Sequence, residues 1–121
     1  MGYRSDVAAL FYVTDKKNFP VIKLWLDENF PMDTFRSSIK WFDRGMVFHE
    51  TEVKWYDDYE EVKAFEAARK QFIDMFCKDG HEGVQGAYEF MRVGEEYNDI
   101  ETDCCGDYDN LLELKREILP P

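Results

Sequence analysis

Hydrophobic and polar positions follow different periods along the chain, and one stretch near its start is apolar almost throughout. Residues 6–13 carry a single charged side chain, that of Asp6, and end in aromatic and β-branched residues. An apolar run of this length without alternation is typical of a strand that is buried on both faces. We therefore predict a central strand here, with later elements covering both of its faces.

The next apolar segment, residues 21–26, fits two interpretations. Asn18 and Pro20 favour the start of a helix, in which an apolar face would be formed by Val21, Leu24 and Trp25. The β-branched start of the segment also permits a strand. Either element should end before Pro31, because the residue that precedes a proline is pushed out of helical geometry.

A period of two from residue 35 predicts an antiparallel hairpin. Ile39 and Trp41 share one face, residues 43–45 supply the turn, and the return strand starts at Met46. Alternating positions toward its end are Thr51, Val53 and Trp55. Phe48 is out of phase with them, so we expect a bulge near residues 49–50 that re-aims its side chain.

The clearest helix is predicted over residues 59–77. Asp58 and Glu61 have the spacing of a capping box, and an apolar stripe follows at helical spacing: Val62, Phe65, Ala68, Phe72 and Phe76. Beyond it, residues 87–93, 97–101 and 112–118 are predicted as strands, with a turn around Gly106.

The predicted order of elements is strand, helix, hairpin, helix and strand. This order predicts a single α+β domain over residues 1–121. The βαββαβ pattern is that of a ferredoxin-like antiparallel sheet with two helices, here with an added C-terminal strand or hairpin. The helices would cover one face. We expect the C-terminal extension or a partner to cover part of the other, on the reasoning that Phe11, Trp41 and Trp55 cannot all point to the same side.

Composition and charge narrow the function classes. The 121 residues are 45% hydrophobic and 17% aromatic, enough for a core without metal or disulfide support, and Cys77, Cys104 and Cys105 are expected to be reduced. No secretion signal or membrane-spanning run is apparent, so a soluble cytoplasmic protein is expected. The net charge of -11 argues against direct binding to nucleic acid or to an anionic membrane.

The most unusual stretch is residues 95–109, which holds seven acids and no base: Glu95, Glu96, Asp99, Glu101, Asp103, Asp107 and Asp109. It fits a solvated turn between two strands or a docking surface for a basic partner. Three of the acids mimic the first ligand positions of a calcium loop, but Cys104 stands where that loop needs glycine and Asn110 where it needs glutamate. We therefore expect no dedicated metal site.

Other candidate residues lack a catalytic pattern. Arg4 either pairs with Asp6 at the end of the central strand or contacts a ligand or partner at the edge of the sheet. His49 and His81 lie in no metal-binding spacing, and no nucleophile with a neighbouring base or phosphate-binding glycine loop occurs. We expect no cofactor and no enzymatic activity.

The chain contains four short motifs: the opening residues 2–7 (Gly-Tyr-Arg-Ser-Asp-Val), residues 54–56 (Lys-Trp-Tyr), residues 90–95 (Phe-Met-Arg-Val-Gly-Glu) and residues 99–101 (Asp-Ile-Glu). Together they resemble motifs of a family of small uncharacterised proteins from tailed phages and prophages. The similarity spans most of the chain and implies an accessory phage protein in a bacterial host's cytoplasm, where small acidic proteins often bind host or defence components. It implies no activity and assigns no site residue.

The sequence thus predicts a protein-binding module that uses the acidic stretch, with Arg4, against a basic host or defence protein and possesses no catalytic residues. Two alternatives stay open. One is a self-associating structural domain that dimerises through the sheet face around Trp41 and Trp55. The other is a small metal-dependent enzyme that uses the carboxylates of residues 95–109.

Overall fold

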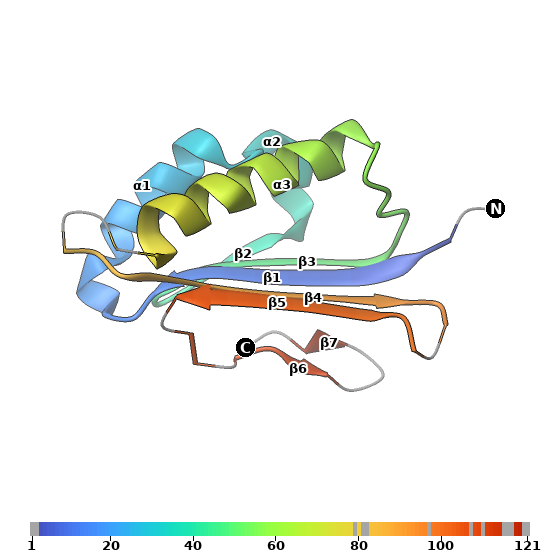
Figure 1. Ribbon diagram of the computed structural model, residues 1–121. Coiled ribbons are helices and arrows are strands. Elements are labelled where there is room, and N and C mark those ends of the chain that lie inside the picture. Colours follow the sequence, from blue (N-terminus) through green and yellow to red (C-terminus); the bar gives the residue numbers. More distant parts are fainter. Residues whose placement is uncertain are drawn as a thin grey trace.

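A buried strand, β1 (Ser5–Val13), lies in the middle of an antiparallel sheet, as its composition predicts. It pairs with β3 on one side and with β4 on the other, and its residues 7–13 are fully inaccessible to solvent. The computed structural model describes residues 3–78, 80, 83–96, 98–106, 108–109, 111–114 and 118–119. In it, helices cover one face of the sheet and the C-terminal hairpin lies against the other (Figure 1).

The remaining strands of the sheet are β2 (Ile39–Phe42), β3 (Gly45–Val53), β4 (Gly86–Gly94) and β5 (Ile100–Gly106). The helices are α1 (Phe19–Asn29), α2 (Met32–Phe35) and α3 (Glu60–Phe72), with short 3-10 turns η1 (Lys16–Asn18) and η2 (Arg36–Ser38) and a π-helical segment η3 (Ile73–Cys77). A separate hairpin is formed by β6 (Glu113–Leu114) and β7 (Ile118–Leu119).

The α+β class and the antiparallel sheet are confirmed, but the ferredoxin-like plan is not confirmed as predicted. In the described part of the chain the sheet has five strands in the order β2-β3-β1-β4-β5, and three α-helices stand where two were expected. The extra strand, β5, is formed by part of the acidic stretch and pairs with β4. Among the described residues, no helix has the length and apolar character needed to cross a membrane.

The first helical interpretation is correct, but its buried face was predicted wrongly. Residues Ile22 and Leu26 of α1 are fully buried, whereas Val21 is 43% and Leu24 61% exposed. Apolar residues occur on more than one side of this helix, so their spacing alone does not identify the face that meets the sheet. The helix ends at Asn29, and its C-cap, Phe30, is extended before Pro31, as predicted.

The long helix matches its predicted stripe and differs in its start. Val62, Phe65, Ala68 and Phe72 are buried in α3, and Phe76 is buried in η3, which continues the helix. The predicted capping box is wrong, because Tyr59 is the N-cap and no side chain bonds to the free backbone N–H groups there. Two glutamates in the first turn complement the helix dipole instead.

The hairpin contains a bulge, two residues later than predicted. Ser5 pairs with Val53 and Val7 with Glu50, so two residues of β3 lie opposite Asp6 alone. Glu52 takes a positive φ of 54° there, and its N–H donates to Asp6 Oδ1 at 2.9 Å. The extra residue shifts the alternation of side chains, which lets Phe48 and Val53 face the same core.

That core corrects the prediction about the two faces of the sheet. Phe11 lies within the helix-side cluster, and Trp41 and Trp55 both pack against it, so all three point to one side. The C-terminal extension or a partner was expected on the opposite face, and the structure places the C-terminal segment there. Leu111 and Leu112 pack on a cluster that includes Leu10. The prediction of one strand over residues 112–118 is wrong, because residues 113–114 and 118 belong to β6 and β7, which pair antiparallel; residues 115–117 lie outside the described residues.

Candidate functional site

The acidic stretch, residues 95–109, was expected as a turn between two strands, but it forms both a turn and an edge strand. The predicted strand over residues 97–101 is wrong in its bounds, since β5 begins at Ile100 and continues to Gly106. Glu95, Glu96 and Asp99 lie in the turn between β4 and β5, and Glu101 and Asp103 lie on β5. Tyr97 and Asp107 fall outside the described residues. This arrangement places successive carboxylates beside side chains from other strands.

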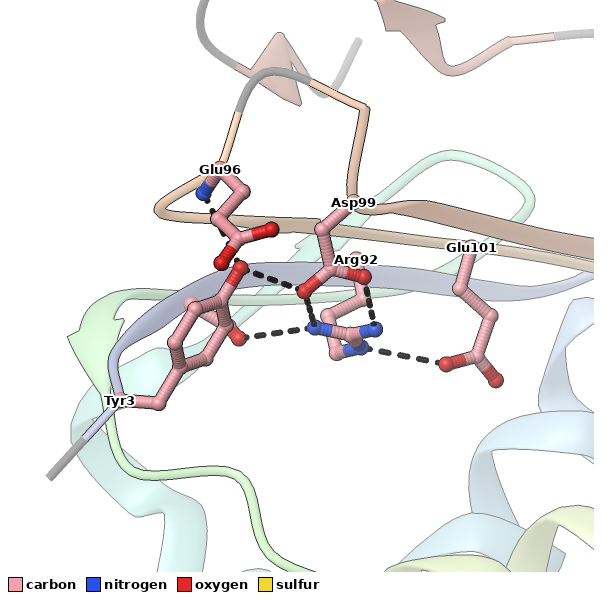
Figure 2. A network of polar contacts seen from close by, with 6 residues as sticks. Tyr3, Arg92, Glu96, Asp99 and Glu101 are labelled. Atoms are coloured by element: carbon pink, nitrogen blue, oxygen red, sulfur yellow. Dashed lines mark hydrogen bonds and ion pairs between the residues drawn. The ribbon is translucent and has the colours of Figure 1, made fainter.

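Arg92 of β4 engages two of these carboxylates (Figure 2). Its Nη2 donates to Asp99 Oδ1 at 2.8 Å, its Nη1 to Asp99 Oδ2 at 3.2 Å, and its Nε to Glu101 Oε1 at 3.1 Å. The strand register places Arg92 directly opposite Glu101. Such a bidentate contact fixes the turn against the sheet.

Tyr3 closes the same network from the start of the chain. Its hydroxyl donates to Asp99 Oδ2 at 2.6 Å and accepts the N–H of Glu96 at 3.0 Å. The bonds from Arg92, and then from Tyr3, lower the pKa of Asp99 below its usual range, because they stabilise the ionised carboxylate. The same carboxylate raises the pKa of Tyr3. Asp99 is therefore a structural tie between the chain's start and the turn.

Asp103 is held by a cation from the helix layer. Arg69 of α3 forms an ion pair with Asp103 and a second one with Glu66 at 3.3 Å. The guanidinium also lies 5.5 Å from the centre of the Tyr88 ring. Burial raises the pKa of the Tyr88 hydroxyl, although the guanidinium acts in the opposite direction. Asp103 thus helps to fasten β5 to the helix.

Asp109 belongs to an anchor on the opposite face of the sheet. Its carboxylate pairs with Arg44 at 2.9 Å, and its N–H donates to the Tyr12 hydroxyl at 2.7 Å. That hydroxyl donates to Glu89 Oε2 at 2.5 Å, and Glu89 Oε1 accepts the N–H of Leu112 at 3.1 Å. Glu89 is only 4% exposed, so this buried carboxylate holds the C-terminal segment on the sheet.

The arginines and Glu89 were missed because nothing in their local sequence marks them. Arg92, Arg69 and Arg44 lie on three different elements, and each meets its carboxylate only after the strands pair and the helix packs. The alternation of β4 could have placed Arg92 on the helix side, but its partner depends on the register with β5. Residues 95–109 therefore contain no basic side chain of their own, but arginines from other elements pair with their carboxylates in the fold.

A groove of about 330 Å³ lies where β1 begins and β4 ends. Carboxylates line it from three strands or turns: Asp6, Glu52 and Glu95. The predicted ion pair between Arg4 and Asp6 does not occur among the ion pairs of the described residues. Instead, the Arg4 guanidinium donates to the backbone oxygen of Glu52 at 3.0 Å, and the Arg4 N–H donates to Glu95 Oε1 at 2.7 Å.

The groove is strongly acidic and open to solvent. The side chains of Arg4, Glu52 and Glu95 are exposed, and exposed Glu96 follows in the turn. Arg4 is the one cation that lines the groove among the described residues. The arrangement offers carboxylate oxygens at the ends of adjacent strands, which is suited to a lysine or arginine side chain approaching from solvent.

Other candidate chemistry is sparse in the described residues. They contain no group of three or more histidine, cysteine or acidic side chains positioned to hold a metal ion. Cys77, Cys104 and Cys105 are free, and burial raises the pKa of the Cys77 thiol to about 12, with a further contribution from Cys105. His49 Nε2 is shielded from solvent without a hydrogen-bond partner there, and His81 falls outside the described residues.

Comparison with known proteins identifies no relative: no family model, curated protein or solved structure matches this chain.

Proposed function

We propose that this protein is a protein-binding module that receives a basic segment of its partner in the acidic groove at the ends of β1, β3 and β4. The observation that carries this proposal is the groove itself, in which Asp6, Glu52 and Glu95 meet from three parts of the chain. The neighbouring Glu96 extends the negative surface into the turn. Attraction of this kind accelerates association with a basic partner and favours it over acidic competitors.

The proposal uses part of the acidic stretch. Asp99, Asp103 and Asp109 are ion-paired with arginines, so their charges are partly neutralised and act mainly within the fold. Glu95 and Glu96 have no arginine or lysine side chain against them among the described ion pairs. Glu101 keeps a 60% exposed side chain although it contacts Arg92. Glu101 does not line the groove, however, so the partner-binding residues that we propose are Arg4, Asp6, Glu52, Glu95 and Glu96.

The biological setting that we propose rests on the resemblance to small tailed-phage and prophage proteins. In that setting the protein acts in the cytoplasm of a bacterial host, and the basic partner is a host or defence protein whose activity it inhibits. The large negative charge supports this choice over nucleic acid, whose phosphates would be repelled at short range.

The fold proposal follows from the same sheet. The order β2-β3-β1-β4, with helices on one face, supports a ferredoxin-like core to which β5 and the C-terminal hairpin are added. Self-association through a sheet face around Trp41 and Trp55 is not proposed, because both rings pack against the helix-side core.

Binding of a blocked basic peptide, acetyl-(Lys-Arg)₄-amide, to the purified protein tests the groove directly. Fluorescence anisotropy of the labelled peptide should show saturable binding that weakens as salt is raised. The double variant Glu52→Gln, Glu95→Gln should bind roughly tenfold more weakly, which corresponds to ~1.4 kcal/mol. Glutamine keeps the oxygen that accepts the Arg4 N–H at position 95, so the loop should hold its shape.

A matched double variant, Asp33→Asn with Glu28→Gln, removes the same number of charges from α1 and α2, where both residues are exposed. It should bind the peptide almost as well as the unchanged protein. Equal losses in the two double variants would show that net charge alone attracts the peptide, and the groove would then have to be abandoned as the binding site. Binding that is indifferent to salt would be equally decisive against it.

A further inference from the structure

The edge of the sheet opposite β5 is formed by β2 (Ile39–Phe42). In the described part of the chain, β2 is the terminal strand in the order β2-β3-β1-β4-β5 and pairs only with β3, which leaves its outer edge open. In an antiparallel ladder, alternate residues of such a strand turn their backbone N–H and C=O groups away from the paired neighbour. These groups form a template to which another extended segment can add.

A cavity lies on each face of the sheet beside this edge, and Trp41 lines both of them. The one on the outer face has a volume of about 520 Å³ and is lined by Lys40, Phe42, Val47 and His49 among others. The one on the helix side has a volume of about 290 Å³ and is lined by Asp27, Met32, Arg36, Ile39 and Trp41. Successive side chains of an added strand would point alternately toward these two cavities.

The outer cavity differs in charge from most of this acidic protein. Lys40 is its one lysine or arginine, no carboxylate lines it, and Lys40 has no ion-pair partner among the described residues. Ser38, which also lines this cavity, donates its hydroxyl to Glu50 Oε1 at 2.9 Å. An acidic side chain, which can pair with Lys40, suits this cavity better than a basic one.

The inner cavity has its charges compensated. Asp27 pairs with Lys23 at 2.8 Å, and Arg36 pairs with Asp33. Its remaining lining, Met32, Ile39 and Trp41, is apolar. An apolar side chain would bury its surface here without displacing an ion pair.

From the open edge and the two unlike cavities we infer that β2 receives an extended peptide segment in which acidic and apolar residues alternate. The segment pairs with the backbone of β2 as a sixth strand, with an acidic side chain beside Lys40 and an apolar one beside Trp41 and Met32. β2 pairs with residues 45–48 of β3, whereas the acidic groove lies near Glu52 at the far end of that strand. The two surfaces therefore use separate residues, and either proposal can fail alone.

Nuclear magnetic resonance titration of the ¹⁵N-labelled protein with the blocked hexapeptide acetyl-(Val-Glu)₃-amide tests this inference. Saturable amide shift changes should be largest at Ile39–Phe42. A lysine counterpart, acetyl-(Val-Lys)₃-amide, should bind about tenfold more weakly, because its charges face Lys40. A counterpart with alternate backbone nitrogens methylated should also lose binding, because it cannot donate to the strand edge.

The variant Lys40→Glu should reverse the preference between the two peptides. Lys54→Glu makes the same change of charge after the end of β3, where Lys54 is exposed, and should leave the preference unchanged. Shift changes centred elsewhere, no saturable binding, or undiminished binding of the methylated peptide would each overturn the inference. So would a dimer in light scattering whose contact maps to Ile39–Phe42, because a second copy of the chain would then occupy the edge.

Discussion

Replacing Tyr12 by phenylalanine removes one oxygen atom from the anchor of the C-terminal segment. That hydroxyl donates to Glu89 Oε2 and accepts the N–H of Asp109, so the variant loses two hydrogen bonds. The ring keeps its place, because its contacts with Phe42 and with the Arg44 guanidinium do not use the oxygen. The change therefore isolates the polar contribution.

Its magnitude follows from the two bonds. A hydrogen bond to a charged group contributes about 1.5–3 kcal/mol and a neutral one about 0.5–1.5 kcal/mol. Tyr12 is fully buried and Glu89 is 4% exposed, so water has little access to replace either bond. We expect Tyr12→Phe to lower the free energy of unfolding by about 2–4.5 kcal/mol.

Urea denaturation followed by tryptophan fluorescence measures this loss, and amide hydrogen exchange locates it. Exchange at Asp109 and Leu112 should accelerate more than exchange in the middle of β1, since only the anchor is loosened. Tyr59→Phe is the control, because the Tyr59 hydroxyl takes part in none of the hydrogen bonds of the described residues. This variant should change the free energy of unfolding by no more than about 0.5 kcal/mol. Adding Glu89→Gln to Tyr12→Phe should recover part of the loss, because the buried charge is removed.

A loss below about 1 kcal/mol in Tyr12→Phe would refute this reasoning, because it would mean that water or a rearranged side chain replaces both bonds.

Gly94→Ala should lower the melting temperature and speed exchange in the turn, because an added Cβ would overlap the Tyr3 hydroxyl; an unchanged melting temperature would contradict this. Glu66→Gln should raise the melting temperature near pH 7, where calorimetry measures it, and the gain should fade toward about pH 3. Burial raises the pKa of Glu66, so the folded state holds that proton more tightly than the unfolded state, and ionisation penalises folding as the pH rises. A gain that persists at low pH would count against this cause. With a thiol reagent at pH 8, exposed Cys104 should react first and Cys77 last. Cys77 is buried, and its pKa of about 12 leaves only ~0.01% of its thiol ionised at that pH. Mass spectrometry of the labelled peptides gives the order of reaction.

Elements with one unambiguous period could be predicted from the sequence. The buried run of β1 and the stripe from Val62 to Phe76 each fit a single structure, and both are found where expected. The face of α1 could not be chosen in the same way, because Leu24 is as apolar as Leu26 although only Leu26 is buried. There the packing of the sheet decides which side is covered.

The candidate site shows a different limit. Its acids are obvious in the sequence, but their partners come from positions 7 to 65 residues away, such as Arg92 for Asp99 and Arg44 for Asp109. Pairing of β4 with β5 and packing of α3 must be known before these contacts can be seen. A local count of charges therefore overstates how much of an acidic stretch is available to a partner.

The division between paired and unpaired acids has a consequence for salt dependence. The ion pairs of Asp99 and Asp103 involve arginine side chains that are 17% and 27% exposed, so dissolved ions screen them only in part. Glu95 and Glu96 are exposed, so dissolved ions screen their charges more strongly. Rising salt should therefore weaken the capture of a basic segment well before it loosens the fold. If binding of the basic segment and stability of the fold were lost over the same range of salt concentration, the charges of the groove and of the ion pairs would have to be coupled. That result would contradict the separate arrangement of their residues.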